Sequence, residues 1–242
     1  VGDFDPDATV AAVGGTFGAL PAREAKRAYT EQRKVSVPAA PLARQYTVES
    51  EIPKALIRLF WPATDGRDIK LTRRLRLLTE VFSDRLRVEI REKLGGTYSP
   101  NAGADLSDTY PGYGWLVADA TVAPDQARAI ADAIKAVAAA LHDQGVTEEE
   151  LVRAKQPVLT QLRESARTNP YWLGSVLAAA QEFPERLDWS RSRYTDNESV
   201  TAAELSALAK QYLDPARASE FIVVPAAATP AQGTPGVVPG GK

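Results

Sequence analysis

The order of strand-like and helical segments along the chain most constrains its fold. Short apolar runs predict strands, and a 3.6-residue apolar period predicts a helix. These patterns predict strands at 55–61, 97–106, 112–122 and 221–224, and a long helix over 68–93. The second and third strands are joined around Asp108–Gly112, which is typical of a hairpin. Strands paired by a hairpin favour an α+β sheet with helices on one face over a doubly wound parallel sheet.

The remaining helices come in a run between the hairpin and the closing strand. Capping boxes at Thr147–Glu150 and Thr201–Glu204 each predict the start of a helix. Pro157 lies inside the first of these helices, where we expect a kink rather than an end. Further helical patterns cover residues 125–142 and 171–181.

Composition shifts divide the chain into three parts. Residues 1–45 are expected to be a trailing strand–helix element and linker of a preceding domain, with Asp5 as an N-cap before Pro6. The linker is expected to hold a short strand at Val35–Val37. Residues 46–224 form the main α+β domain, and residues 225–242, rich in Ala, Pro and Gly, predict a disordered tail. Because the chain opens in mid-pattern at Val1, we expect it to be a piece of a longer protein.

Three counts exclude whole classes of function. The chain has no Cys and one His, so thiolate catalysis, disulfides and any site that needs two histidines from one chain are excluded. It holds 29 Lys plus Arg against 31 Asp plus Glu, which gives no overall field for nucleic acid. No apolar run approaches the roughly 18 residues of a membrane span.

Most polar motifs have a structural explanation. The pairs Gly14–Gly15 and Gly95–Gly96 lack the strand–turn–helix context of a phosphate-binding loop. His142 is expected at a helix C-terminus, where the dipole favours it. The acidic run Glu148–Glu150 could bind a cation, but a capping box with acids in the first turn explains it fully.

The stretch Arg91–Ser99 is the most informative for function. It combines a helix end, a Gly-rich turn and a strand start, so Arg91 and Tyr98 are predicted to project near one edge of the sheet. A cation and a phenol hydroxyl could hold a peptide carbonyl or a developing oxyanion. The alternative is that Arg91 only stabilises the helix end and Tyr98 only packs.

Four stretches together resemble the insulinase/pitrilysin family of zinc metallopeptidases, specifically its C-terminal, non-zinc half. They are Val1–Asp5 with Phe17–Pro21, Arg91–Ser99, Gly145–Leu151 and Thr168–Trp172. The resemblance implies an αβ-roll, with an antiparallel sheet of about six strands and helices packed on one face. It also implies zinc in an N-terminal half, on a His-x-x-Glu-His motif that this chain lacks.

The resemblance implies roles for two residues. Arg91 would hold a substrate carbonyl, and Tyr98 would donate to the tetrahedral intermediate. One departure is that this chain reads Leu94-Gly95-Gly96-Thr97-Tyr98, whereas some members have the tyrosine directly after Leu-Gly. The chain is therefore expected to enclose a peptide substrate beside a zinc-binding half or partner subunit, with no metal or catalytic residue of its own, and to be inactive alone.

Two other functions stay open. The same fold could serve as a non-catalytic scaffold or assembly subunit, and an unrelated ligand-binding α+β domain would require the resemblance to be spurious. A neighbouring His-x-x-Glu-His segment would support the peptidase. A periplasmic or secreted location is implied only by the resemblance to exported bacterial members.

Overall fold

The computed structural model describes residues 2–22, 24, 29–93 and 100–226. Contacts divide the chain into two compact units, Val1–Arg33 and Lys34–Lys242. Each unit is described separately below.

The first unit is built on one short helix. Helix α1 (Pro6–Gly15) begins where predicted, because the Asp5 carboxylate accepts a hydrogen bond of 2.8 Å from the Ala8 amide and Pro6 occupies the first turn. A 3-10 turn, η1 (Phe17–Ala19), follows. Residues Gly2–Asp5 form no strand, and the apolar side chains of Val10 and Phe17 are exposed.

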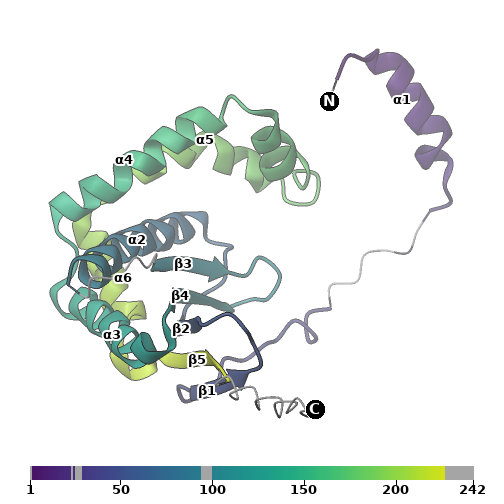
Figure 1. Cartoon of the computed structure of the whole chain (residues 1–242). Coiled ribbons are helices and arrows are strands. Elements are labelled where there is room, and N and C mark those ends of the chain that lie inside the picture. The colour runs from purple at the N-terminus through teal and green to yellow at the C-terminus, as the bar shows by residue number, and fades with distance from the viewer. Residues whose placement is uncertain (1, 23, 25–28, 94–99, 227–242) are drawn as a thin grey trace, which may run out of the picture. The chain divides into compact units, whose positions relative to one another are not determined.

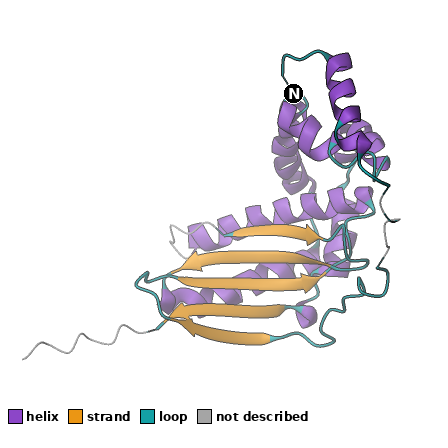
Figure 2. Cartoon of the chain, turned by 90° about the vertical axis from the view of Figure 1, so that its right-hand side faces the viewer, coloured by secondary structure: helices purple, strands orange, loops and turns teal. Residues whose placement is uncertain are grey.

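The second unit is built on a five-stranded sheet in the order β1-β5-β2-β4-β3 (Figure 2). The strands are β1 (Ala43–Val48), β2 (Ala55–Pro62), β3 (Asn101–Leu106), β4 (Gly114–Val122) and β5 (Ser219–Pro225). Three of the four neighbouring pairs are antiparallel, and β1 pairs with β5 in parallel. The α+β class is therefore confirmed, with one parallel pair at an edge that local sequence signals do not reveal.

Alternation along the two central strands determines which face of the sheet is covered. In β2, Ile57, Leu59 and Trp61 are fully buried, while the residues between them are half-buried or exposed. The same alternation runs along β4. Because successive strand residues point to opposite faces, the helices cover one face of the sheet (Figure 2).

The helices form two groups: one packs on the covered side of the sheet, and the other lies above α2, past the β3 end of the sheet (Figure 1). Helices α2 (Ile69–Arg87) and α3 (Ala127–Gln144) pack on the sheet, and α6 (Ala202–Tyr212) packs against both. Helices α4 (Glu148–Ser165) and α5 (Glu185–Glu198) pack against each other and on α2, farther from the strands. None of the helices in the described ranges is long and apolar enough to span a membrane.

The helix predictions agree with the structure in most places. Both capping boxes are formed, and Pro157 lies inside α4. The helix predicted over 68–93 changes character at its end, where α2 gives way to a π-helical turn, η2 (Val88–Lys93). The helix predicted over 171–181 is a π-helical segment, η4 (Tyr171–Leu177), followed by turns. Short 3-10 turns, η3 (Pro124–Gln126) and η5 (Pro215–Arg217), precede α3 and β5.

One prediction about local structure is wrong, and one helix was not predicted. Val35–Val37 is not a strand, and the first strand of this unit is β1 at Ala43–Val48 instead. Helix α5 was not predicted, because its few apolar residues give no 3.6-residue period. The residues beyond Ala226, including most of the predicted tail 225–242, lie outside the described part of the chain.

Candidate functional site

The candidate substrate-binding segment, Arg91–Ser99, begins in the π-helical turn η2. The backbone of Arg91 lies in this turn, directly after α2. The side chain of Arg91 and all of Tyr98 lie outside the described residues, so their predicted meeting at the sheet edge stays a prediction. What the structure does describe is how each end of the segment is held.

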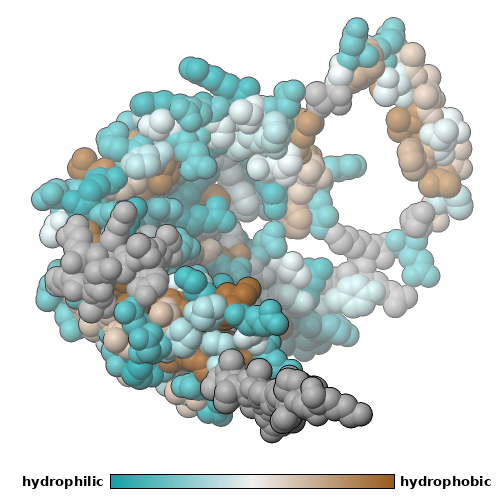
Figure 3. Space-filling model, viewed as in Figure 1, coloured by the Kyte–Doolittle hydropathy of each residue, from teal (hydrophilic) through white to brown (hydrophobic). Residues whose placement is uncertain are grey.

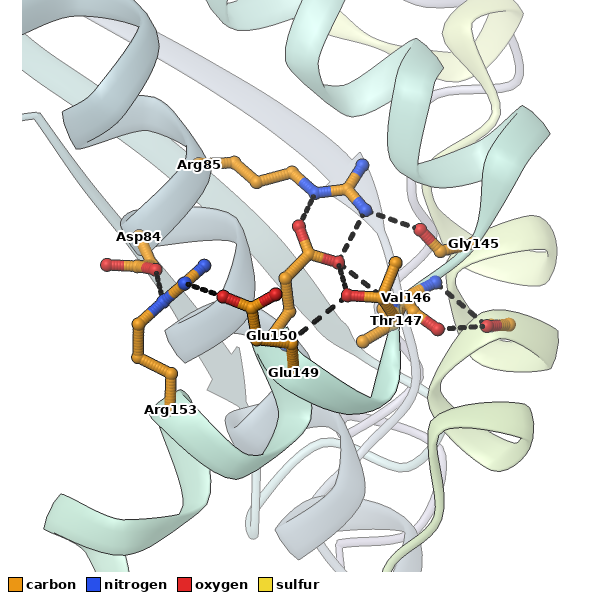
Figure 4. Close-up of polar contacts among 9 residues, drawn as sticks. Asp84, Arg85, Gly145, Val146, Thr147, Glu149, Glu150 and Arg153 are labelled. Carbon is orange, nitrogen blue, oxygen red and sulfur yellow. Dashed lines mark hydrogen bonds and ion pairs between the residues drawn. The ribbon is translucent and has the colours of Figure 1, made fainter. Parts of the chain in front are cut away.

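The N-terminal end of the segment is anchored to the core and to α4 (Figure 4). Ile90 is fully buried in the hydrophobic core. One turn earlier, the Arg85 guanidinium donates to the two carboxylate oxygens of Glu150 at 2.6 and 2.9 Å, and to the Gly145 carbonyl oxygen at 2.6 Å. A two-pronged, charge-assisted contact of this kind fixes the position of the end of α2 relative to the start of α4.

Glu150 has two structural tasks at once. Its carboxylate accepts from the Thr147 amide at 2.9 Å and closes the capping box of α4, while it also pairs with Arg85. The hydrogen bond from Arg85, with those from Thr147, lowers the pKa of Glu150 to about 2 despite its burial. The acidic run therefore caps a helix, as predicted, and in addition clamps that helix to α2.

A second ion-pair group lies beside this clamp on the surface. Arg153 donates to Asp84 at 2.6 Å (Figure 4). Arg87 also pairs with Asp84. These hydrogen bonds lower the pKa of Asp84 against the opposing effect of burial. Because Arg87 and Arg153 are at least half-exposed, this group contributes less to stability than the Arg85–Glu150 contact.

The C-terminal end of the segment is held by the same helix. The Ser83 hydroxyl on α2 accepts from the Ala102 amide at 2.8 Å and donates to the Ala102 carbonyl at 3.1 Å. Ala102 is the second residue of β3, and it is buried. Both flanks of Leu94–Ser99 are therefore attached to the last turns of α2, which is the support that a substrate-contacting segment needs.

The described residues do not fit a zinc site. Among them, no group of three or more His, Cys, Asp or Glu side chains could hold a metal ion. The one histidine, His142, lies in the last turn of α3 as predicted, and its Nδ1 is 2.6 Å from a carboxylate oxygen of Asp143. A chain with one His and no Cys cannot supply the nitrogen and sulfur ligands of a typical zinc centre.

The structure also shows a cavity lined by arginines that the sequence analysis missed. It lies between α2, α4, η4, α5 and the β3–β4 loop, and it has a volume of about 670 Å³. Arg186, Trp189 and Arg193 line it from α5, where spacings of three and four residues place them on one helix face. That spacing indicates one face of a helix, but it does not indicate the residues of α2, α4 and η4 that complete the cavity around this face.

Comparison with known proteins identifies the family. The family model for the peptidase M16 inactive domain matches residues 1–158. The stromal processing peptidase of Pisum sativum chloroplasts is 34% identical over 114 residues, which are 47% of this chain and 9% of that protein. The chain thus spans about a tenth of the length of this curated relative.

Solved structures agree on the fold. The peptidase M16 inactive domain from Pseudomonas fluorescens superposes with a TM-score of 0.72 at 21% identity, over 94% of this chain and 53% of that one. The periplasmic protease PqqL from Escherichia coli gives a TM-score of 0.69 at 18% identity, over 93% of this chain and 25% of that one. The resemblance to the zinc-free half of a zinc metallopeptidase is therefore confirmed, and the chain belongs to the peptidase M16 inactive-domain family.

Proposed function

We propose that this chain is the substrate-enclosing half of a zinc metallopeptidase that hydrolyses peptides. The observation that carries the proposal is the match of residues 1–158 to the inactive-domain family in a chain with one His and no Cys. Such a chain contributes walls and substrate contacts, while the zinc and its ligands belong to an N-terminal half or a partner subunit. Alone, the chain is expected to be inactive.

The helix-free face of the sheet supports an enclosing role. Phe60, Trp115 and Phe221 form edge-to-face ring contacts with centroids 5.7–5.9 Å apart, and Tyr113 extends this row at 5.8 Å from Trp115. These side chains line a groove of about 570 Å³ on the open face. Exposed apolar surface of this kind is typical of faces that meet a peptide or another protein domain.

The N-terminal unit fits the same proposal. Helix α1 exposes Val10 and Val13, and the turn η1 that follows it exposes Phe17. We infer that residues 1–45 complete a preceding domain and link it to the domain of residues 46–224. A preceding domain would cover the apolar side of α1.

Within the proposed enzyme, Arg91 and Tyr98 would contact substrate. The flanks of the segment support this role, because Ile90 is buried in the core and Ala102 is hydrogen-bonded to Ser83 of α2. A guanidinium donates to a peptide carbonyl oxygen, and a phenol hydroxyl can stabilise negative charge on an oxygen. Both groups therefore suit contact with a peptide bond under attack.

The test mixes this chain with the His-x-x-Glu-His half encoded in the same gene or beside it, and measures peptide cleavage with zinc. Arg91→Ala and Tyr98→Phe are compared with Arg191→Ala and Tyr29→Phe, which change exposed residues of the same types. We expect each site substitution to lower kcat/KM at least about tenfold, or ~1.4 kcal/mol, and each control to leave it unchanged.

Other results assign other roles. Cleavage that is insensitive to Arg91→Ala and Tyr98→Phe would leave the chain as a passive wall. A mixture that assembles but shows no chelator-sensitive cleavage would reject the peptidase proposal and favour a scaffold subunit.

A further inference from the structure

The arginine-lined cavity of about 670 Å³ lies beside the first turns of α2, whereas the candidate segment follows the last turn of this helix. Its volume is within the roughly 300–1,000 Å³ that small-ligand sites occupy. Figure 3 shows this face of the molecule hollowed between the layer of α4 and α5 and the layer that contains α2, with a mainly hydrophilic surface. Four arginines line the cavity, namely Arg73, Arg76, Arg186 and Arg193.

Two of the four guanidinium groups hold the helices together. Arg73 is 8% exposed, pairs with Asp196 and donates to the Trp189 carbonyl oxygen at 2.5 Å. Arg193 donates to the Leu162 carbonyl and stacks 3.8 Å above the ring of Tyr171. Both side chains bind α5 to its neighbours, so they form the rigid wall of the cavity.

The other two guanidinium groups have hydrogen-bonding capacity left. The Nε of Arg186 is buried and has no hydrogen-bond partner among the described residues. Its other nitrogens make only long contacts, at 3.3 Å to the Ser175 carbonyl and 3.6 Å to Asp108. The side chain of Arg76 is exposed and makes no hydrogen bond or ion pair within the described ranges.

A second buried polar group of the cavity also lacks a hydrogen-bond partner among the described residues. Thr72 is 3% exposed, lines the cavity, and its hydroxyl oxygen has no partner among the described residues. Buried polar atoms are nearly always hydrogen-bonded, so two exceptions in one cavity point to a polar occupant. A guanidinium Nε–H and a hydroxyl can both donate to an oxygen.

The charge balance selects the occupant. The four arginines face three carboxylates, because Glu80 and Asp108 line the cavity and Asp196 pairs with Arg73. The surplus is one positive charge, which matches a carboxylate better than a phosphate of charge near −2. Aliphatic side chains, including Leu77, Leu106 and Val158, make up much of the remaining wall and suit the neighbours of an acidic residue in a peptide.

We propose that this cavity binds a carboxylate of a peptide, with Arg186 and Arg76 as its charged contacts. The identification of the occupant as a peptide rests on the proposed function; the carboxylate preference rests on the cavity itself. The carboxylate can come from an acidic side chain or from a peptide C-terminus, and both present the same two oxygens to the guanidinium forks.

The test measures binding to this chain alone, without the zinc-binding half, by fluorescence polarisation. The probes are short fluorescein-labelled peptides: one with a single glutamate and an amidated C-terminus, one with glutamine in its place, and the glutamine peptide with a free C-terminus. We expect at least one of the two carboxylate peptides to bind about tenfold more tightly than the neutral peptide. Which one does so identifies the source of the carboxylate, and the preference should shrink at high salt.

Variants assign the preference to the cavity. Arg186→Gln and Arg76→Gln should each reduce the preference for the carboxylate peptide about threefold or more. Arg191→Gln, on the same helix but 73% exposed and outside the cavity, should leave it unchanged. Arg76 has no partner in the described residues, so Arg76→Gln tests the site without a risk to folding, and a melting curve checks Arg186→Gln.

Equal binding of all three peptides would overturn the proposal, as would a preference that survives both substitutions. Because the assay does not use cleavage, its outcome is independent of the proposed peptidase activity. A carboxylate preference in a chain that never supports cleavage would uphold the site and reject the peptidase. Cleavage without the preference would support the peptidase and reject the carboxylate site.

Discussion

The contact between Arg85 and Glu150 gives the sharpest test of how the candidate segment is supported. Replacing Glu150 with glutamine removes the negative charge but keeps a side chain that can close a capping box. Glu149→Gln is the matched control, because the Glu149 carboxylate is next in the sequence, is 87% exposed and contacts Arg153 at 3.4 Å. The comparison therefore separates the effect of the Arg85–Glu150 ion pair from the effect of the capping box.

The structure indicates the size of the effect. The pKa of Glu150 is about 2 instead of the ordinary 4.5, which corresponds to about 3 kcal/mol as an upper limit. Part of that shift comes from Thr147, whose hydrogen bonds glutamine retains. The Arg85 contact itself, between side chains only 16–18% exposed, should then contribute about 2 kcal/mol. Glu149→Gln should cost under about 0.5 kcal/mol.

Urea unfolding followed by tryptophan fluorescence measures both variants. A carboxylate with a lowered folded-state pKa stabilises the protein above its unfolded pKa, near 4.5, and loses that effect as the pH falls toward 2. The difference between wild type and Glu150→Gln should therefore fall by about half between pH 7 and pH 3. In the proposed peptidase, the same variant should lower kcat/KM about threefold or more, because the end of α2, which leads into η2, loses its contact with α4.

Two results would refute this reasoning. One is an equal loss of stability in Glu150→Gln and Glu149→Gln at pH 7. The other is a cost of Glu150→Gln that does not change with pH, which would mean that the lost stability is packing rather than charge.

The other predictions concern stability and isolation. Glu220 is 6% exposed, and hydrogen bonds from Arg128 and Lys135 lower its pKa to about 2. In urea titrations, Glu220→Gln should destabilise the protein by about 2 kcal/mol at pH 7 and by less at pH 3. The control Asp132→Asn changes an exposed carboxylate and should cost under about 0.5 kcal/mol. Gly114→Ala should cost about 2–3 kcal/mol in thermal unfolding, because its Cβ would lie 2.0 Å from a backbone carbonyl oxygen, whereas Gly103→Ala meets nothing within 4 Å and should cost much less. The isolated chain should show no chelator-sensitive peptidase activity, and activity in the pure chain would contradict the assignment of zinc to another half.

Local signals in the sequence predicted the central part of the fold. The strand at 55–61 and the hairpin were predicted from apolar runs, because their residues are buried by alternation along β2 and β4. The starts of α4 and α6 were predicted because a capping box lies within four consecutive residues. These features depend on neighbours in the sequence, so one sequence is enough to find them.

Features that depend on distant residues were missed. Strand β1 is exposed along its whole length and is defined by pairing with β5, about 177 residues later, so it has no apolar signal. Helix α5 is held by Arg73, more than 110 residues away, through Asp196 and the Trp189 carbonyl. The arginine cavity follows from this helix, and for that reason it could not be predicted from local patterns. Arg91 and Tyr98 were proposed from a motif, and their side chains stay a prediction.

Helix α2 connects the two proposed contacts with substrate. Arg76 lines the cavity, and Arg91 follows the end of the same helix 15 residues later. At 1.5 Å per residue this separation is roughly 20 Å, which an extended peptide spans with about six residues. The two proposals together therefore predict that cleavage favours an acidic residue about six positions from the cleaved bond. A positional library of peptides with one movable glutamate tests this spacing, since a cavity unrelated to cleavage would give no preferred position.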